Sequence, residues 1–147
     1  MASEKLTQDE AERLLSMLKH SLIKEINFPQ CGTSIEFDVE GETKQDIFCV
    51  NIFRGKINGK KYNISARIKK NGILLLELHI NPTNVHINPD GEKLIGSHWH
   101  SYDEKYGRKI AFPAYDIKDT DFVENTIKFF DEFNIIEKPK VIYQLEL

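Results

Sequence analysis

The chain has 147 residues, of which 40% are hydrophobic and 29% charged, and its formal net charge at pH 7 is −3. The length suits one globular domain over residues 1–147, and this composition supports a packed core and argues against intrinsic disorder. So small a net charge gives no overall electrostatic attraction to nucleic acid or to a membrane surface.

The chain carries no sequence signal for secretion or for a membrane. Residues 2–12 are polar and charged, unlike a signal peptide, and no apolar run approaches the roughly 20 residues that a membrane helix needs. The two cysteines, Cys31 and Cys49, do not form a disulfide framework. We therefore expect a cytoplasmic protein with reduced thiols and no contact with a membrane.

The N-terminal region has the pattern of an amphipathic helix. Thr7 and Glu10 match a capping box, and Pro29 lies beyond the end of the pattern. Between them, apolar residues recur at helical spacing: Leu14, Leu15, Leu18, Leu22, Ile23 and Ile26. This spacing predicts a helix over residues 7–27.

The middle of the chain alternates between apolar and polar residues, as half-buried strands do. The alternation and the turns at Asn58-Gly59 and Asn71-Gly72 predict an antiparallel meander. Its six strands are expected at residues 34–40, 45–53, 61–69, 73–80, 97–103 and 108–115. A second helix from 119 or 120 to about 133, ended by Asn134, and a last strand over 141–147 complete an α+β fold.

Four of the five histidines lie between residues 77 and 102: His79, His86, His98 and His100. Histidine titrates near neutral pH and is the commonest metal ligand in proteins. Side chains two apart on a strand share a face, so His98, His100 and Tyr102 should point the same way and Trp99 toward the core. By the same argument Glu77 and His79 share one face of the strand before them.

The connection between these strands, residues 81–96, is longer than most loops and contains two Asn-Pro steps and Asp90-Gly91. Long connections in compact domains are commonly functional. We expect an ordered flap that folds over the His98/His100 face and places His86 at its rim.

If the histidine-bearing faces of these strands lie on the same side of the sheet, their acidic, basic, cationic and phenolic side chains come together. Phosphodiester cleavage without a metal requires such a combination of groups. The catalytic residues would be His79, His98, His100, Tyr102 and Glu77. The substrate would be bound by Arg67, Arg108, His86 and Asn88. The first hypothesis is therefore a small endoribonuclease with a toxin-like role, which needs no cofactor and has RNA as its partner.

Two other hypotheses fit the same residues. His98, His100 and His86 could bind zinc or another divalent metal, although their spacing matches no established zinc motif. Alternatively, the histidines could simply face solvent on an exposed strand, and the loop could be rich in Asn, Pro and Gly only because it turns.

Three short motifs carry a resemblance. They are H-x-N-P-D-G at residues 86–91, H-W-H-x-Y at 98–102 and Y-G-x-K/R…A-x-P at 106–113. The segment resembles a family of small uncharacterised bacterial proteins associated with mobile genetic elements. That setting implies a toxin, an antitoxin or a phage counter-defence protein. It adds a further alternative: a non-enzymatic inhibitor that binds a protein partner, either an antitoxin or a host defence protein.

Overall fold

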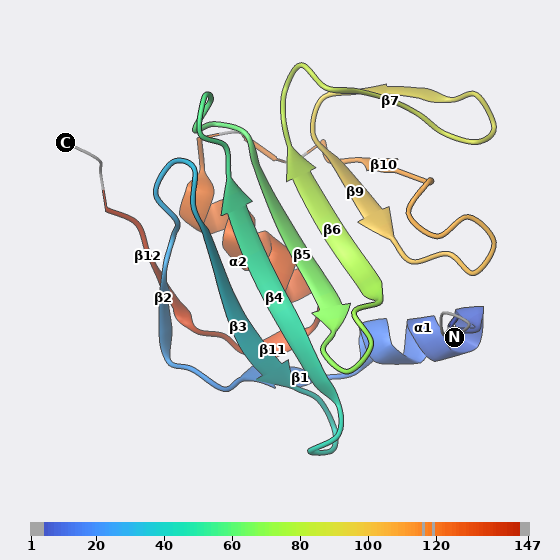
Figure 1. The fold of residues 1–147 in the computed structure, drawn as a ribbon, viewed down its shortest axis with the longest axis vertical. Coiled ribbons are helices and arrows are strands. Elements are labelled where there is room, and N and C mark those ends of the chain that lie inside the picture. The colour runs from blue at the N-terminus through green and yellow to red at the C-terminus, as the bar shows by residue number, and fades with distance from the viewer. Residues whose placement is uncertain (1–4, 116, 119, 145–147) are drawn as a thin grey trace.

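The protein is built on one large, mostly antiparallel sheet, seen face-on in Figure 1 with α2 behind it. The structure is a computed structural model that describes residues 5–115, 117–118 and 120–144. The helices are α1 (Gln8–Ser16) and α2 (Phe122–Glu132). The strands are β1 (Lys19–Ser21), β2 (Glu25–Asn27), β3 (Ser34–Glu40), β4 (Ile47–Arg54), β5 (Tyr62–Ile68), β6 (Leu74–Ile80), β7 (Val85–Ile87), β8 (Lys93–Ile95), β9 (His98–Ser101), β10 (Phe112–Pro113), β11 (Ile135–Glu137) and β12 (Lys140–Ile142).

The eight-stranded sheet has the order β10-β9-β6-β5-β4-β3-β1-β11. From β3 to β10 every neighbouring pair is antiparallel, so the predicted meander and the α+β class are confirmed. Beyond β3 the sheet gains β1 and β11, which pair in parallel. Two short pairs lie outside this sheet, β12 with β2 and β7 with β8.

The helix side of the sheet holds the aromatic core. Edge-on contacts join Phe37 of β3 to Phe130 and Phe48 of β4 to Phe133, with ring centroids 5.7 and 5.4 Å apart. Trp99 stacks on Phe129 at 6.0 Å, which confirms the prediction that Trp99 points toward the core. The opposite face of the meander carries the polar half of each alternating pattern and is open toward the viewer in Figure 1.

The helix predicted over residues 7–27 is wrong beyond Ser16. The capping box of Thr7 and Glu10 is present, but Met17 is extended and the chain then enters β1 and β2. Leu18 and Leu22 of the supposed apolar stripe are 57% and 51% exposed. The short β1 forms in place of a longer helix because it hydrogen-bonds to β3 on one side and β11 on the other. His20 lies on it, paired with Glu40 at 3.1 Å.

Lys19 explains why the chain leaves the helix where it does. Its side chain is 1% exposed, and its Nζ donates to the carbonyl oxygens of Leu15, Met17 and Phe133 at 3.1, 2.8 and 2.8 Å. The ammonium group also lies 3.9 Å from the centre of the Phe133 ring. Burial lowers the pKa of Lys19 to about 7. One side chain thus joins the end of α1 to the end of α2.

Three other expectations need correction. The strand expected over 108–115 is only β10, where Pro113 sits at the sheet edge as predicted. A bulge in the β5–β6 register turns Leu75 into the core, although alternation placed it on the open face. The last strand is β12 rather than 141–147, whose final three residues lie outside the described ones.

The second helix is present, although it begins at Phe122 after Asp121 and not at residue 120. The helix ends before Asn134, which has a φ of 61°; residue 119, one of its two expected starts, lies outside the described residues. Cys49 is buried, and burial raises the pKa of its thiol to about 11. No helix within the described ranges has the length and apolar character to cross a membrane.

Replacing Lys19 by methionine should destabilise the protein by about 3 kcal/mol, because three carbonyl oxygens at two helix ends lose their donor. Urea unfolding at pH 7 measures this change, and Lys70→Met, at an exposed lysine, is the control. A loss below about 0.5 kcal/mol, typical of surface substitutions, would show that Lys19 does not join the helix ends.

Candidate metal centre

Two strands of the open face and the flap bring the four histidines of residues 77–102 together. In the β6–β9 register, His79 lies opposite His98 and Glu77 opposite His100. Directly opposite residues on antiparallel strands have Cβ atoms about 5 Å apart, so their side chains meet. The hairpin of β7 and β8 then adds His86.

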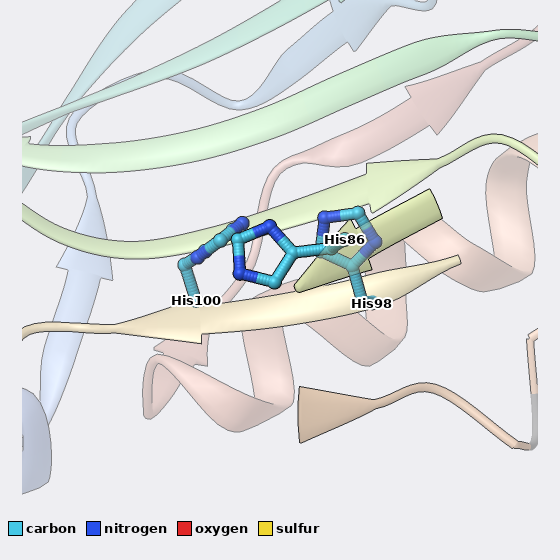
Figure 2. A group of neighbouring side chains, drawn as sticks. All are labelled: His86, His98 and His100. Atoms are coloured by element: carbon cyan, nitrogen blue, oxygen red, sulfur yellow. The ribbon is translucent and has the colours of Figure 1, made fainter. Parts of the chain in front are cut away.

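The imidazole rings are in direct contact. The ring centroid of His98 lies 4.9 Å from that of His100, and the His86 centroid lies 5.5 and 5.1 Å from them. Figure 2 shows these three rings turned toward one another, two rising from β9 and one from β7. His79 stacks on His98 at 5.1 Å with an interplanar angle of 7°. The expected flap is therefore present as a hairpin, with His86 in the cluster.

Backbone carbonyl groups orient three of the rings. Nδ1 of His98 faces the Gly96 oxygen and Nδ1 of His100 the Ile110 oxygen, both at 3.0 Å. Nε2 of His86 faces the Lys109 oxygen at 2.9 Å. A carbonyl oxygen can only accept, so the facing nitrogen must carry the hydrogen. A neutral ring then keeps one lone pair: at Nε2 of His98 and His100, and at Nδ1 of His86.

The cluster disfavours protonation of its most buried members. His98 is 2% exposed and His100 is 7% exposed. Burial lowers the pKa of His98, and burial together with the neighbouring His79 and His98 lowers the pKa of His100 to about 4. At neutral pH His98 and His100 are therefore uncharged, the form that binds a metal ion.

His86, His98 and His100 each place one ligand nitrogen within 4.8 Å of the others. In tetrahedral zinc, with Zn–N bonds of about 2.1 Å, neighbouring ligand nitrogens are about 3.4 Å apart. The three nitrogens would thus have to approach one another by at most about 1.4 Å to share an ion. These are the three residues that the sequence analysis named as possible metal ligands.

Glu77 and Arg108 form an ion pair beside the cluster. Glu77 is 5% exposed and accepts from Arg108 at 2.5 and 2.6 Å; its Oε1 also lies 3.4 Å from Nε2 of His79. Burial alone would raise the pKa of Glu77, but the hydrogen bonds from His79 and Arg108 outweigh it and lower that pKa. A charged Glu77 therefore holds His79 and Arg108 next to the three rings.

Asn88 anchors the hairpin rather than lining an open site. Its side chain donates to the oxygen of Ala111 at 3.0 Å and accepts from the nitrogen of Ala111 at 2.8 Å, while only 8% of the residue is exposed. This pair of bonds ties the flap to the segment that also supplies the carbonyl groups of Lys109 and Ile110. Asn88, which was predicted to bind substrate, thus makes both of these hydrogen bonds to the backbone of Ala111.

Two other predicted site residues lie elsewhere. The chain leaves the strand after Ser101, and the Tyr102 hydroxyl donates to the oxygen of Leu6 at 2.9 Å and accepts from its nitrogen at 3.0 Å. Tyr102 packs against the core, so alternation wrongly placed it beside His100. Arg67 is on the open face but pairs with Glu36 of β3 at 3.2 Å.

A larger cavity, of about 630 Å³, lies on the helix side of the sheet and is separate from the histidines. Its lining includes Leu15 of α1, Trp99 of β9 and Phe112 of β10. A smaller one, of about 330 Å³, reaches the cluster through His79.

The fold and the cluster define an α+β protein whose meander and flap converge on three histidines. Residues 6–135 match the model of a family of unknown function, DUF6978, and the chain belongs to this family. Searches of the curated proteins and of the solved structures find no match.

The pKa of His100 predicts how the metal-free protein responds to acid. In the unfolded chain His100 becomes protonated as the pH falls below its ordinary pKa of 6.5. In the folded protein His100 becomes protonated only near pH 4. The free energy of unfolding should therefore fall as the pH is lowered through this range, by about 3 kcal/mol from His100.

Urea unfolding between pH 7 and 4, in a chelator, tests this prediction. His100→Asn keeps a donor for the Ile110 oxygen but removes the titrating group, so its stability should depend less on pH. His20→Asn, outside the cluster, is the control. Equal pH dependence of wild type and His100→Asn would contradict the assignment.

Proposed function

We propose that the protein binds a divalent transition-metal ion, zinc first, through His86, His98 and His100. We further propose that it uses this centre to hydrolyse a phosphodiester, with RNA as the first substrate to test. The observation that carries the proposal is the meeting of three imidazoles, each of which has already committed its N–H to a backbone carbonyl.

Three neighbouring rings that each keep one lone pair would be satisfied together by a common positive partner. A bridging water has only two hydrogens to offer, whereas a cation satisfies all three nitrogens at once. Metal-binding histidines typically donate their other N–H to a carbonyl or carboxylate, which fixes the tautomer and the ring orientation. The carbonyl bonds of these rings follow that pattern.

The ligand set favours zinc and leaves room for chemistry. Imidazole suits zinc as well as copper, iron and nickel, and three protein ligands with one open position are typical of catalytic zinc sites. A bound ion would lower the pKa of a coordinated water and so supply a nucleophile near neutral pH. His79, held by Glu77, is placed to take up a proton, and Arg108 offers positive charge to a phosphate.

The metal-independent endoribonuclease remains the competing proposal. It is supported by the group of Glu77, His79 and Arg108, which combines base and cation beside His98. It is weakened because His98 and His100 resist protonation, whereas a general acid must carry a proton. Activity that survives in excess chelator would select this alternative.

A non-enzymatic inhibitor of a protein partner is supported by a different observation. The outer side of the flap exposes Val85, Ile87 and Ile95, which are 52, 66 and 70% exposed. Apolar residues grouped on a surface are typical of protein contacts. We place either function in the cytoplasm, where the thiols of Cys31 and Cys49 would stay reduced.

Metal binding should be measurable on protein purified without a histidine tag. We expect one zinc per chain by elemental analysis after dialysis. His98→Asn and His86→Gln each keep a donor for the carbonyl but lose the second ring nitrogen, which would bind the metal. Each substitution should therefore weaken zinc binding at least tenfold. His20→Asn should bind like the wild type. A wild type that takes up no zinc, cobalt or nickel would refute the centre.

Activity is tested with a fluorogenic RNA whose cleavage relieves quenching. The zinc-loaded protein should cleave it, excess chelator should abolish cleavage, and added zinc should restore it. Arg108→Gln should slow cleavage about tenfold or more if the cation stabilises the reacting phosphate. A zinc-loaded protein that cleaves neither RNA nor single-stranded DNA would contradict the phosphodiester assignment.

A further inference from the structure

The cavity of about 330 Å³ on the open face lies next to the histidine cluster. His79 is part of its wall, and the same ring contacts His98 and His100 at 5.1 and 5.0 Å. A molecule in the cavity therefore lies one side chain away from the metal ligands. Its volume is at the lower end of the range for small-molecule sites, which suits one small group.

The strand register aligns the cavity with the centre. Phe53 of β4 pairs with Asn63 of β5, Asn63 pairs with His79 of β6, and His79 pairs with His98 of β9. Neighbouring strands are about 4.8 Å apart, so this row spans about 14 Å from Phe53 to His98. A ligand that follows the row would have one end in the cavity and the other at the histidines.

The cavity wall combines an aromatic face, amide groups and a cation. Phe53 is 47% exposed although it is large and apolar, and Asn63 beside it is exposed. Asn81 uses its oxygen to accept from the nitrogen and hydroxyl of Thr83, which leaves its amide NH₂ as the donor. The residues that would contact a ligand are Phe53, Lys61, Asn63, His79, Asn81 and Asn84.

We propose that this cavity binds the base of a nucleotide, stacked on Phe53 and hydrogen-bonded by the surrounding asparagines, with the phosphate directed along the row toward the histidines. Stacking on an aromatic side chain accepts any base, whereas amides recognise the polar edge of a base. Lys61 supplies a positive charge for a backbone phosphate. The binding of a base in this cavity does not depend on the metal centre. The role of the cavity as a substrate subsite of that centre rests on the proposed function.

Calorimetric titration of the full chain with AMP, UMP and ribose 5-phosphate tests the site. Excess chelator is present throughout, so binding cannot depend on a metal, and a failed metal centre would not hide a working base site. Both nucleotides should bind at least tenfold more tightly than ribose 5-phosphate. Tetrauridylate is the fourth probe: tighter binding than UMP indicates RNA as the source of the base, and equal binding indicates a free nucleotide.

Phe53→Ala should weaken the binding of AMP and UMP at least tenfold, because it removes the side chain on which the base stacks. Phe53→Tyr should restore binding to within about threefold, because it keeps an aromatic face. Phe112→Ala removes a phenylalanine that is 51% exposed on β10, outside the cavity, and should bind like the wild type. The proposal is overturned if no nucleotide binds, if ribose 5-phosphate binds as well as AMP, or if Phe53→Ala matches the wild type.

Discussion

The hydrogen bonds between three imidazole rings and three backbone carbonyl groups are the constraint on which the site depends. They fix which nitrogen of His86, His98 and His100 carries hydrogen and leave the other nitrogen of each ring with a lone pair. Without them a histidine ring could rotate and offer its hydrogen to another ring. The rest of the fold serves to place the carbonyls of Gly96, Lys109 and Ile110 around β9.

The positions of these carbonyl groups depend on several segments at this edge of the sheet. Gly96 has a φ of 98°, a conformation that favours glycine, at the turn that returns the flap to β9. Asn88 ties the flap to Ala111, next to the carbonyl groups that hold His86 and His100. The flap, the turn and the segment before β10 therefore support one another, and the buried Glu77, paired with the exposed Arg108, lies opposite His100 in the strand register.

The sequence predicted the meander and the two-faced strands because alternation depends on local geometry alone. The same rule put His98 and His100 together and Trp99 in the core. It failed where long-range contacts decide: residues after Ser16 form β1 because β3 and β11 offer hydrogen bonds, and a bulge turns Leu75 inward. Tyr102 was misplaced because the strand ends one residue earlier, and its hydroxyl binds the distant Leu6.

Parts of the site could not be read from residue types at all. The ring-orienting partners are backbone oxygens, which carry no sequence signal, and Asn88 looks the same whether it meets a substrate or Ala111. Phe53 sits on the polar face of a strand whose alternation points it outward, so an exposed aromatic residue near Asn63 was a signal that could have been used.

The tautomers of the histidines in the metal-free protein test the central claim most directly. Long-range ¹H–¹⁵N NMR of the rings at pH 7 distinguishes hydrogen at Nδ1 from hydrogen at Nε2. The carbonyl bonds require neutral His98 and His100 with hydrogen at Nδ1 and His86 with hydrogen at Nε2. His98 and His100 with hydrogen at Nε2, or charged at pH 7, would contradict the account.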